Sequence, residues 1–280
     1  MPVVTIDNRG LISIAGEDAE DLLQNIITTD LSLVAAGEAW PGALLTPQGK
    51  ILVEFLIGRT DAGFLMETAA ADTDALIKRL TLYRLRAKVT FEKLETGEVA
   101  LIWDEAQPEA GLSDQRFARA GIMLKRVPGH GGTEAISLYR ALRMANGISG
   151  GGEDGPLGDY FPHDLMMDKN GGLSFKKGCY IGQEVVSRMQ HRSTARRRLA
   201  AVSAEYALAE PGAPLLAGGR EIGTLIATEG NKGLAVVRID KAGSAMAAGA
   251  AITLAEQNVT LVLPVWCGLG FPTDMDEAAS

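Results

Sequence analysis

The chain has 280 residues, of which 46% are hydrophobic and 22% are charged, and its formal net charge is −8 at pH 7. This length is enough for one large domain or two to three small ones, and the composition is that of a globular protein rather than a disordered one. Such a negative charge disfavours a general nucleic-acid binder, which needs a broad basic field, although it leaves room for a local basic groove.

The first two thirds of the chain alternate short strands with a few helices. Hydrophobic alternation predicts strands, with turns at 8–10 and 46–49, and apolar residues at helical spacing predict helices. The expected strands are 3–14, 40–45, 51–58, 64–68, 89–94, 99–103 and 122–127, and the expected helices are 16–27, 70–83 and 135–146. Because strands follow one another with few helices between them, the pattern favours an α+β fold over a doubly wound parallel sheet.

From Arg198 onward the pattern changes to short strands separated by glycine and proline. These strands are expected at 199–202, 223–227, 233–237, 251–254 and 259–262. They predict a small antiparallel barrel or sandwich. We therefore divide the chain into an α+β region at 1–195, an all-β region at 196–270 and an acidic tail at 271–280, which we expect to be frayed and flexible.

Cys179 and Cys267 are the two cysteines of the chain. They make no disulfide framework, and two thiolates do not complete the four-ligand set of most iron–sulfur clusters. The three histidines lack the spacing of a zinc site. The first ten residues lack the basic segment and apolar core of a secretory signal, and no apolar run reaches membrane-spanning length. We therefore expect a cytoplasmic protein with no membrane partner.

The strongest candidate for a functional site is the segment 177–184, KGCYIGQE, called the octet below. It holds a cation, a thiol, an aromatic ring, an amide, a carboxylate and two glycines: Lys177, Cys179, Tyr180, Gln183, Glu184, Gly178 and Gly182. A segment selected only for packing does not need this mixture, and glycine lets a ligand approach the backbone closely. The competing interpretation is a tight strand-to-helix turn with Glu184 in the first turn of the helix.

Other polar residues near the octet have two interpretations each. Cys179 is either a small buried hydrophobe or a thiol activated by the lysines before it. The run 162–164, with Asp168 and Asn170, is either a polar wall of the same pocket or a loop of turn-forming residues. Glu54 interrupts an apolar strand and points either to solvent or into a ligand cavity.

A cluster of arginines follows the octet: Arg188, Arg192, Arg196, Arg197 and Arg198. Some of them are expected on a solvated helix face. The functional interpretation is a docking site for carboxylates or phosphates, because arginine holds either group through paired hydrogen bonds.

The octet, with Arg188 behind it, resembles the signature of the YgfZ-type folate-binding proteins, which are relatives of the aminomethyltransferase (T-protein) of the glycine cleavage system. Weaker similarities cover nearly the whole chain, at 14–24, 43–50, 139–148 and 263–266. The resemblance implies a three-lobed, aminomethyltransferase-like α+β fold around a central tetrahydrofolate pocket. In such a fold 1–195 forms two interleaved lobes that bind folate, and 196–270 forms a small antiparallel β-barrel.

The resemblance also implies a binding site for tetrahydrofolate or a derivative of it. The implied ligand-binding residues are Glu54, Lys177, Gly178, Tyr180, Gly182, Gln183, Glu184 and Arg188. In the T-protein an acidic residue on the strand after the first hairpin lies close to the reacting folate nitrogen, and by spacing Glu54 takes that place here. The T-protein lacks the cysteine octet, so the resemblance favours the non-classical branch over a classical aminomethyltransferase.

Three functions remain open from the sequence. The favoured one is a folate-binding accessory protein in iron–sulfur cluster assembly or repair that supports cluster-dependent enzymes, including tRNA-modifying ones. Cys179 would then hold a cluster or a one-carbon adduct transiently, together with ligands of an assembly protein or client enzyme. The second is a folate-dependent aminomethyl or methyl transferase acting on a methylated amine, with Glu54 as the group that orients or deprotonates the amine. Direct RNA binding through the arginines is the least favoured, because the chain is acidic.

Overall fold

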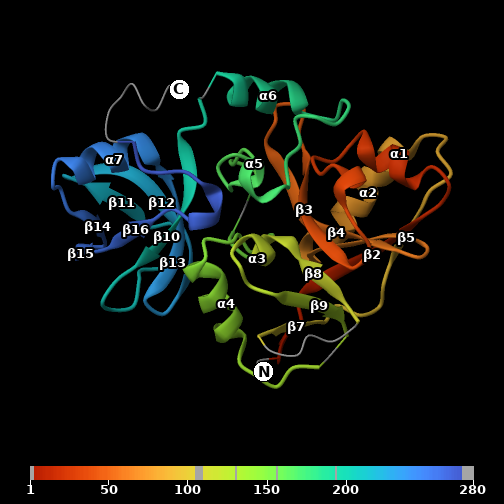
Figure 1. Ribbon diagram of the computed structural model, residues 1–280, viewed down its shortest axis with the longest axis horizontal. Helices are drawn as coiled ribbons and strands as arrows, with labels where there is room; N and C mark the ends of the chain where they lie inside the picture. The colour runs from red at the N-terminus through yellow and green to blue at the C-terminus, as the bar shows by residue number, and fades with distance from the viewer. Residues whose placement is uncertain (1–2, 105–109, 130, 156, 193, 273–280) are drawn as a thin grey trace.

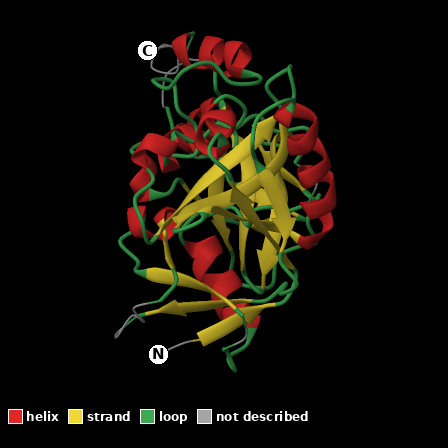
Figure 2. Ribbon diagram, turned by 90° about the vertical axis from the view of Figure 1, so that its right-hand side faces the viewer, coloured by secondary structure: helices red, strands yellow, loops and turns green. Residues whose placement is uncertain are grey.

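Three lobes, each with its own hydrophobic core, make up the computed structural model, which describes residues 3–104, 110–129, 131–155, 157–192 and 194–272. In Figure 1 they form a triangle, with α1 and α2 on the right, the N-terminus at the bottom and the C-terminal strands on the left. Figure 2 shows the strands in the interior with helices around them. The α+β content and the lobed arrangement agree with the expectation from the sequence.

The larger sheet spans the first two lobes and has the strand order β1-β7-β9-β8-β3-β4-β5-β2-β6. Its strands are β1 (Val3–Ile6), β2 (Arg9–Ala15), β3 (Glu38–Leu45), β4 (Ile51–Thr60), β5 (Gly63–Ala69), β6 (Thr90–Lys93), β7 (Val99–Trp103), β8 (Leu112–Asp114) and β9 (Leu124–Pro128). β3 and β8 pair in parallel, and the other pairs are antiparallel.

The turn expected at 8–10 does not fold the segment 3–14 into a hairpin of β1 and β2. β1 pairs with β7, whereas β2 pairs with β5 on one edge and β6 on the other. The residues from Arg9 to Ile14 are all buried or nearly so, and a strand buried in this way takes a partner on each edge. No edge of β2 is then free for β1, so the chain crosses from one lobe to the next at Asp7 and Asn8.

The helices are α1 (Ala19–Gln24), α2 (Thr73–Arg84), α3 (Gln115–Arg119), α4 (Ile136–Ala145), α5 (Met167–Asn170), α6 (Gln183–His191) and α7 (Ile239–Ala247). Short 3-10 turns occur at Leu31–Leu33, Ala70–Asp72 and Val265–Cys267. α1 is shorter than expected, because Gly16 has a φ of 130° and the helix begins only at Ala19. α4 contacts β1 as well as β10, β12 and β13, so it joins two lobes.

The C-terminal lobe is an antiparallel sheet of order β15-β14-β11-β12-β13-β10-β16. Its strands are β10 (Arg197–Ser203), β11 (Pro214–Ala217), β12 (Arg220–Glu229), β13 (Lys232–Arg238), β14 (Ile252–Leu254), β15 (Gln257–Asn258) and β16 (Thr260–Val262). All five strands expected from the sequence are present. The expected tail at 271–280 lies, from residue 273 on, outside the described residues.

The hairpin of β3 and β4 connects the lobes. Ala43, Leu45 and Ile51 belong to the same hydrophobic cluster as the strands of the C-terminal lobe. At its turn Gly49 has a φ of 77°, and a Cβ atom there would lie 3.0 Å from Val185 of α6. The octet therefore sits against the tip of the strand pair that carries Glu54. No helix in the described ranges is long and apolar enough to cross a membrane.

Candidate functional site

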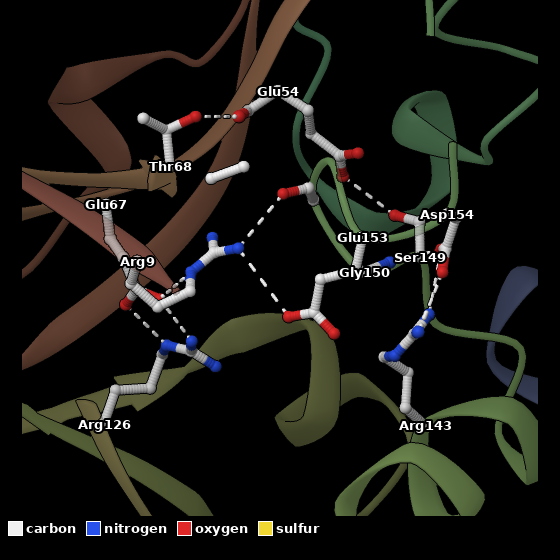
Figure 3. A network of polar contacts seen from close by, with 12 residues as sticks. Arg9, Glu54, Glu67, Thr68, Arg126, Arg143, Ser149, Gly150, Glu153 and Asp154 are labelled. Carbon is white, nitrogen blue, oxygen red and sulfur yellow. Dashed lines mark hydrogen bonds and ion pairs between the residues drawn. The ribbon is translucent and has the colours of Figure 1, made fainter. Parts of the chain in front are cut away.

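Glu54 lies in the middle of β4 and is 2% exposed. The Ser149 hydroxyl donates a hydrogen bond of 2.8 Å to its Oε1, while Oε2 is buried and has no hydrogen-bond partner among the described residues (Figure 3). Burial raises the pKa of Glu54, and the Arg116 charge and the Ser149 hydrogen bond only partly offset this effect. Glu54 therefore points into the protein. Its carboxyl group can form a hydrogen bond with a ligand, as acceptor when ionised or as donor when protonated.

A second buried carboxylate, Glu67 on β5, is held between two arginines. Arg9 Nε donates to its Oε1 over 2.8 Å, and Arg126 Nε donates to its Oε2 over 2.7 Å. Burial alone would raise the pKa of Glu67, but the guanidinium groups of Arg126 and Arg9 outweigh that effect and lower it to about 2. Glu67 is therefore ionised at neutral pH, in contrast to the raised pKa of Glu54.

Arg116 fixes the position of Ser149. Asp114 orients Arg116 by two hydrogen bonds, of 3.0 Å to Nε and 2.7 Å to Nη2. The remaining Nη1 donates to the Ser149 carbonyl over 2.9 Å. Because Ser149 in turn donates a hydrogen bond to Glu54, the orientation of the Glu54 carboxyl group depends on contacts that begin at Asp114 and Arg116, in the lobe that contains β8 and α3.

The glycine-rich loop from Gly147 to Gly155 carries Ser149 and is held by further arginines. Arg143 makes an ion pair of 2.8 Å with Asp154, and both side chains are 2% exposed. Asp154 also accepts from the Gly150 amide over 2.6 Å. Arg9 Nη1 donates to the Gly151 carbonyl over 3.2 Å. The loop is thus a fixed wall beside Glu54, as Figure 3 shows.

Glu153 on this loop is a second buried carboxylate with an oxygen atom free to accept a hydrogen bond. Its Oε1 lies 3.7 Å from Arg9 Nη1, and its Oε2 is buried without a hydrogen-bond partner among the described residues. Buried polar atoms normally have partners, so an unpartnered carboxylate oxygen is a candidate contact for a water molecule or a ligand. Glu54 and Glu153 are two such carboxylates on the same buried network.

The octet lies at a different place, against the tip of the β3–β4 hairpin, and runs into the first turn of α6; half of it anchors the turn before that helix. Lys177 Nζ donates to the carbonyls of Ile27 and Thr29 over 3.0 and 2.6 Å. Burial lowers the pKa of Lys177 to about 8, against the opposing effect of Asp30. The Tyr180 hydroxyl donates to the Ser174 carbonyl over 2.9 Å, and burial raises the pKa of that phenol.

Gly182 closes the turn as the N-cap of α6. Its φ is 79°, and a Cβ atom there would lie 2.6 Å from the carbonyl oxygen of Thr46. Glu184 follows in the first turn of α6, as the strand-to-helix interpretation predicts, and pairs with Arg188 over 2.7 Å on the surface. Gln183 is half-buried beside it.

The other half of the octet faces solvent. Cys179 is an exposed free thiol, and Gly178 before it is exposed with nothing within 4 Å of a Cβ atom placed there. The second cysteine, Cys267, is buried in the C-terminal core. The interpretation of Cys179 as a buried hydrophobe is therefore wrong, and its thiol is accessible to another molecule.

Among the described residues no hydrogen bond or ion pair joins the octet to Glu54. The sequence-predicted residues therefore lie in two places: Glu54 belongs to the buried network, and the octet with Arg188 forms a separate turn and helix start in which Lys177 and Tyr180 are buried and Gly178, Cys179, Glu184 and Arg188 are exposed. Their roles toward a ligand remain predictions.

The arginine cluster after the octet is divided by the fold. Arg188 is exposed on α6, and Arg192, the C-cap residue after the helix, is exposed as well. Arg198 is buried and donates 2.7 Å to the His163 carbonyl and 2.8 Å to Asp168 Oδ1. The His163 and Asp168 side chains are buried around that guanidinium group, and His163 Nδ1 and Asp168 Oδ2 have no hydrogen-bond partner among the described residues. Asn170 accepts from the Gly172 amide. The interpretation of these residues as a polar wall stays a prediction.

Sequence reasoning did not find most of the buried network around Glu54. Its members outside the prediction are Arg9, Glu67, Asp114, Arg116, Arg126, Arg143, Ser149, Glu153 and Asp154. The available signal was the placement of charged residues inside apolar strands, as with Arg9 in β2 and Glu67 in β5. Among the described residues no group of three or more His, Cys, Asp or Glu side chains forms a metal site.

Comparison with known proteins relates this chain to a family. The model of the C-terminal β-barrel domain of CAF17 matches residues 196–269. The human protein named iron–sulfur cluster assembly factor IBA57, mitochondrial, is 34% identical over 275 residues, which cover 84% of this chain and 77% of the human protein. This chain belongs to the IBA57 family.

Other IBA57 proteins match over different lengths. The mouse protein is 31% identical, with 83% of this chain and 76% of the mouse protein covered. The homologue of Chaetomium globosum is 31% identical, but the match spans only 55% of its length. The family is a relative of the YgfZ-type proteins and the aminomethyltransferases, so the resemblance seen in the sequence identified the wider group.

The aminomethyltransferase-like fold expected from the sequence is confirmed. The crystal structure of glycine cleavage system aminomethyltransferase T from Bartonella henselae matches with a TM-score of 0.64, covering 94% of this chain and 85% of that one. The identity is 14%, so this likeness concerns the fold alone. The expectation of a cytoplasmic protein is contradicted, because the names of the IBA57 relatives place them in mitochondria.

Proposed function

We propose that this chain is an iron–sulfur cluster assembly factor whose Cys179 thiolate is a transient ligand to a cluster shared with an assembly protein or client enzyme. The observation that carries the proposal is the exposed thiol on a turn anchored by Lys177, Tyr180 and Gly182. A thiolate held on a fixed backbone loses little freedom when it binds. The printed names of the relatives support the same role.

The other ligands of that cluster come from the partner. Most clusters need four thiolates, and Cys267 is buried in the core of the C-terminal lobe. Client enzymes in this proposal are cluster-dependent ones, with tRNA-modifying enzymes as the class named by the resemblance. Replacement of Cys179 by alanine is expected to lower the activity of such enzymes in cells.

We further propose that the buried network holds tetrahydrofolate or a derivative. The orphaned Oε2 atoms of Glu54 and Glu153 fit this ligand, because a pterin ring presents N–H donors along one edge. Glu54 and Glu153 would accept these donors and Ser149 would keep Glu54 in place. When bound, the folate carries one-carbon units. In this proposal the octet residues and Arg188 remain candidates for contacts with the part of the ligand beyond the pterin ring.

The folate proposal is tested by thermal melting under reducing, oxygen-free conditions. A ligand that binds only the native state stabilises it by about 2.7 kcal/mol at a hundredfold excess over its dissociation constant. We expect a saturable rise of Tm with tetrahydrofolate, a smaller one for Glu54→Gln, and an unchanged one for Cys179→Ala. An identical rise in wild type and Glu54→Gln would remove Glu54 from the binding site, and no rise would end the folate proposal.

A second candidate function is a folate-dependent aminomethyl or methyl transferase. It is favoured by the buried carboxyl group of Glu54 on β4, the second strand of the β3–β4 hairpin, because burial raises the pKa of this group and so makes it a stronger base. Formation of methylene-tetrahydrofolate from a methylated amine is the discriminating assay. Turnover that Glu54→Gln abolishes and Cys179→Ala spares would support the transferase, and no turnover over a broad panel of amines would reject it.

A further inference from the structure

A groove on the C-terminal lobe, formed by β12, β13 and α7, has no role in the function proposed above. Two hollows of about 390 and 450 Å³ form it, and Ile222 and Lys241 line both. α7 lies along one side of the lobe in Figure 1, away from α6 and the octet. The sequence did not predict α7, so the groove could not be predicted from the sequence either.

The groove combines an apolar floor with a mostly basic rim. Its floor contains Ala217, Ile222, Val236 and Ala245, and its rim contains Arg197, Arg220, Glu221, Arg238, Asp240 and Lys241. Four cations thus face two carboxylates in a chain whose overall charge is −8. Such a local excess attracts an acidic ligand against the field of the whole protein.

Two of the cations stand directly opposite each other. Arg197 on β10 and Arg238 on β13 are paired in the antiparallel register. Like charges in this position destabilise a sheet. Asp240 binds Arg238 by hydrogen bonds of 2.9 and 2.6 Å, but the nearest carboxylate to Arg197 is Asp164, 3.8 Å away. The side chains of the two arginines are 43% and 36% exposed, so they remain accessible to an anion.

The linings of the two hollows also bear on the kind of ligand. The lining residues include no aromatic ring. Proteins that bind single-stranded nucleic acid stack bases on aromatic side chains, so these linings favour a polypeptide over RNA.

We propose that this groove binds an acidic segment of a partner polypeptide. Carboxylates of the segment would pair with Arg197, Arg220 and Lys241, and its apolar side chains would cover Ile222 and Ala245. The inference rests on the proposed function, since the acidic segment would belong to the partner that shares the cluster. The groove and Cys179 lie on different elements, so each can be tested without the other.

The test is a direct binding measurement on the full chain. The probe is a short fluorescent peptide of alternating glutamate and leucine, and its anisotropy is followed at low and moderate salt. The double variant Arg220→Glu/Lys241→Glu is expected to weaken binding about tenfold or more, because it reverses two rim charges. Lys232→Glu is the matched control, since Lys232 is an exposed lysine at the far end of the β12–β13 hairpin. Both changes affect exposed side chains, and unchanged Tm values verify folding.

Three results would overturn the proposal. They are the absence of probe binding by the wild-type chain, equal binding by the double variant and the wild type, and equal affinity for a single-stranded oligouridylate of the same charge. Tetrahydrofolate-dependent melting measured on the same double variant separates the two proposals. We expect it to be unchanged, because no groove residue contacts Glu54 among the described residues.

Discussion

Glu54 and Glu67 are buried carboxyl groups on adjacent strands with opposite acid–base behaviour. Two guanidinium groups compensate the charge of Glu67, whereas Glu54 has a single hydroxyl donor and an unpartnered oxygen. The pKa of Glu67 is therefore lowered and that of Glu54 raised. Pairs of titratable groups with diverging pKa values are common at functional sites, which is consistent with our proposal that the network around Glu54 binds a ligand.

The raised pKa of Glu54 predicts how stability depends on pH. The native state holds this proton more tightly than the unfolded state, whose glutamate pKa is about 4.3. The contribution is therefore fully present below that pH and is lost as pH rises through the native pKa. Relative to wild type, Glu54→Gln is expected to gain free energy of unfolding between pH 4.5 and pH 8. Urea unfolding at both pH values measures the change, and a constant difference between the two proteins would contradict it.

Lys177 illustrates a limit of reading single residues from sequence. Its position in the octet suggested a ligand contact, yet its ammonium group donates to two carbonyls of the segment after α1. These acceptors are about 150 residues away in the chain, with separations of 150 and 148. No local pattern reports such a distant partner, so the anchoring role of Lys177 needed the structure.

The turn before α6 is the element that presents the thiol. Its two glycines have different requirements: Gly182 has a positive φ and lies against Thr46, whereas Gly178 has neither constraint. The composition of the octet pointed to this turn and to the helix after it. The composition did not show that the fold requires glycine at position 182 but not at position 178, because that difference depends on the β3–β4 hairpin packed against the turn.

Alanine substitutions separate these two glycines. Gly182→Ala is expected to lower the free energy of unfolding by about 1 to 3 kcal/mol, because alanine meets both the strained φ and the Thr46 oxygen. Gly178→Ala is the matched control and is expected to change stability by less than about 0.5 kcal/mol. Chemical denaturation measures both. Equal effects of the two substitutions would mean that the turn is not held as described.

Other elements show which sequence signals were sufficient. The strands of the C-terminal lobe were predicted because glycine and proline separate them clearly. α7 was missed because its sequence, IDKAGSAMA, is rich in small residues, and tertiary contacts allow the glycine. A Cβ atom on Gly243 would lie 1.9 Å from the Pro272 carbonyl oxygen, a contact that no helical pattern reveals.

The three lobes are connected by buried charges as well as by hydrophobic contacts. Arg198 on β10 reaches the His163 carbonyl and Asp168, and Arg9 reaches the loop that carries Ser149. The α+β class, the barrel and the three-lobed fold could be predicted from local patterns and the octet. The buried network could not, because the contacts of Arg9 and Arg126 that hold it together join residues 58 to 142 positions apart.

Removal of Arg198 is expected to loosen the C-terminal lobe. Arg198→Met leaves Asp168, which is buried, without its cation, and breaking a buried ion pair costs about 3 to 5 kcal/mol. Hydrogen exchange is expected to show faster exchange of the α5 and β10 amides. Arg196→Met is the control, because its ion pair with Asp240 is long, 3.9 Å, and exposed on the arginine side. Equal protection in both variants would show that Arg198 does not hold this region.

The central claim is that the exposed thiol of Cys179, on its anchored turn, serves iron–sulfur cluster assembly. It is tested by the activity of a cluster-dependent enzyme in cells that lack their own factor of this family and express this chain. We predict that wild type and Cys267→Ala restore that activity, whereas Cys179→Ala does not, at equal protein abundance and with an unchanged tetrahydrofolate-induced rise of Tm. Full restoration by Cys179→Ala would contradict the claim.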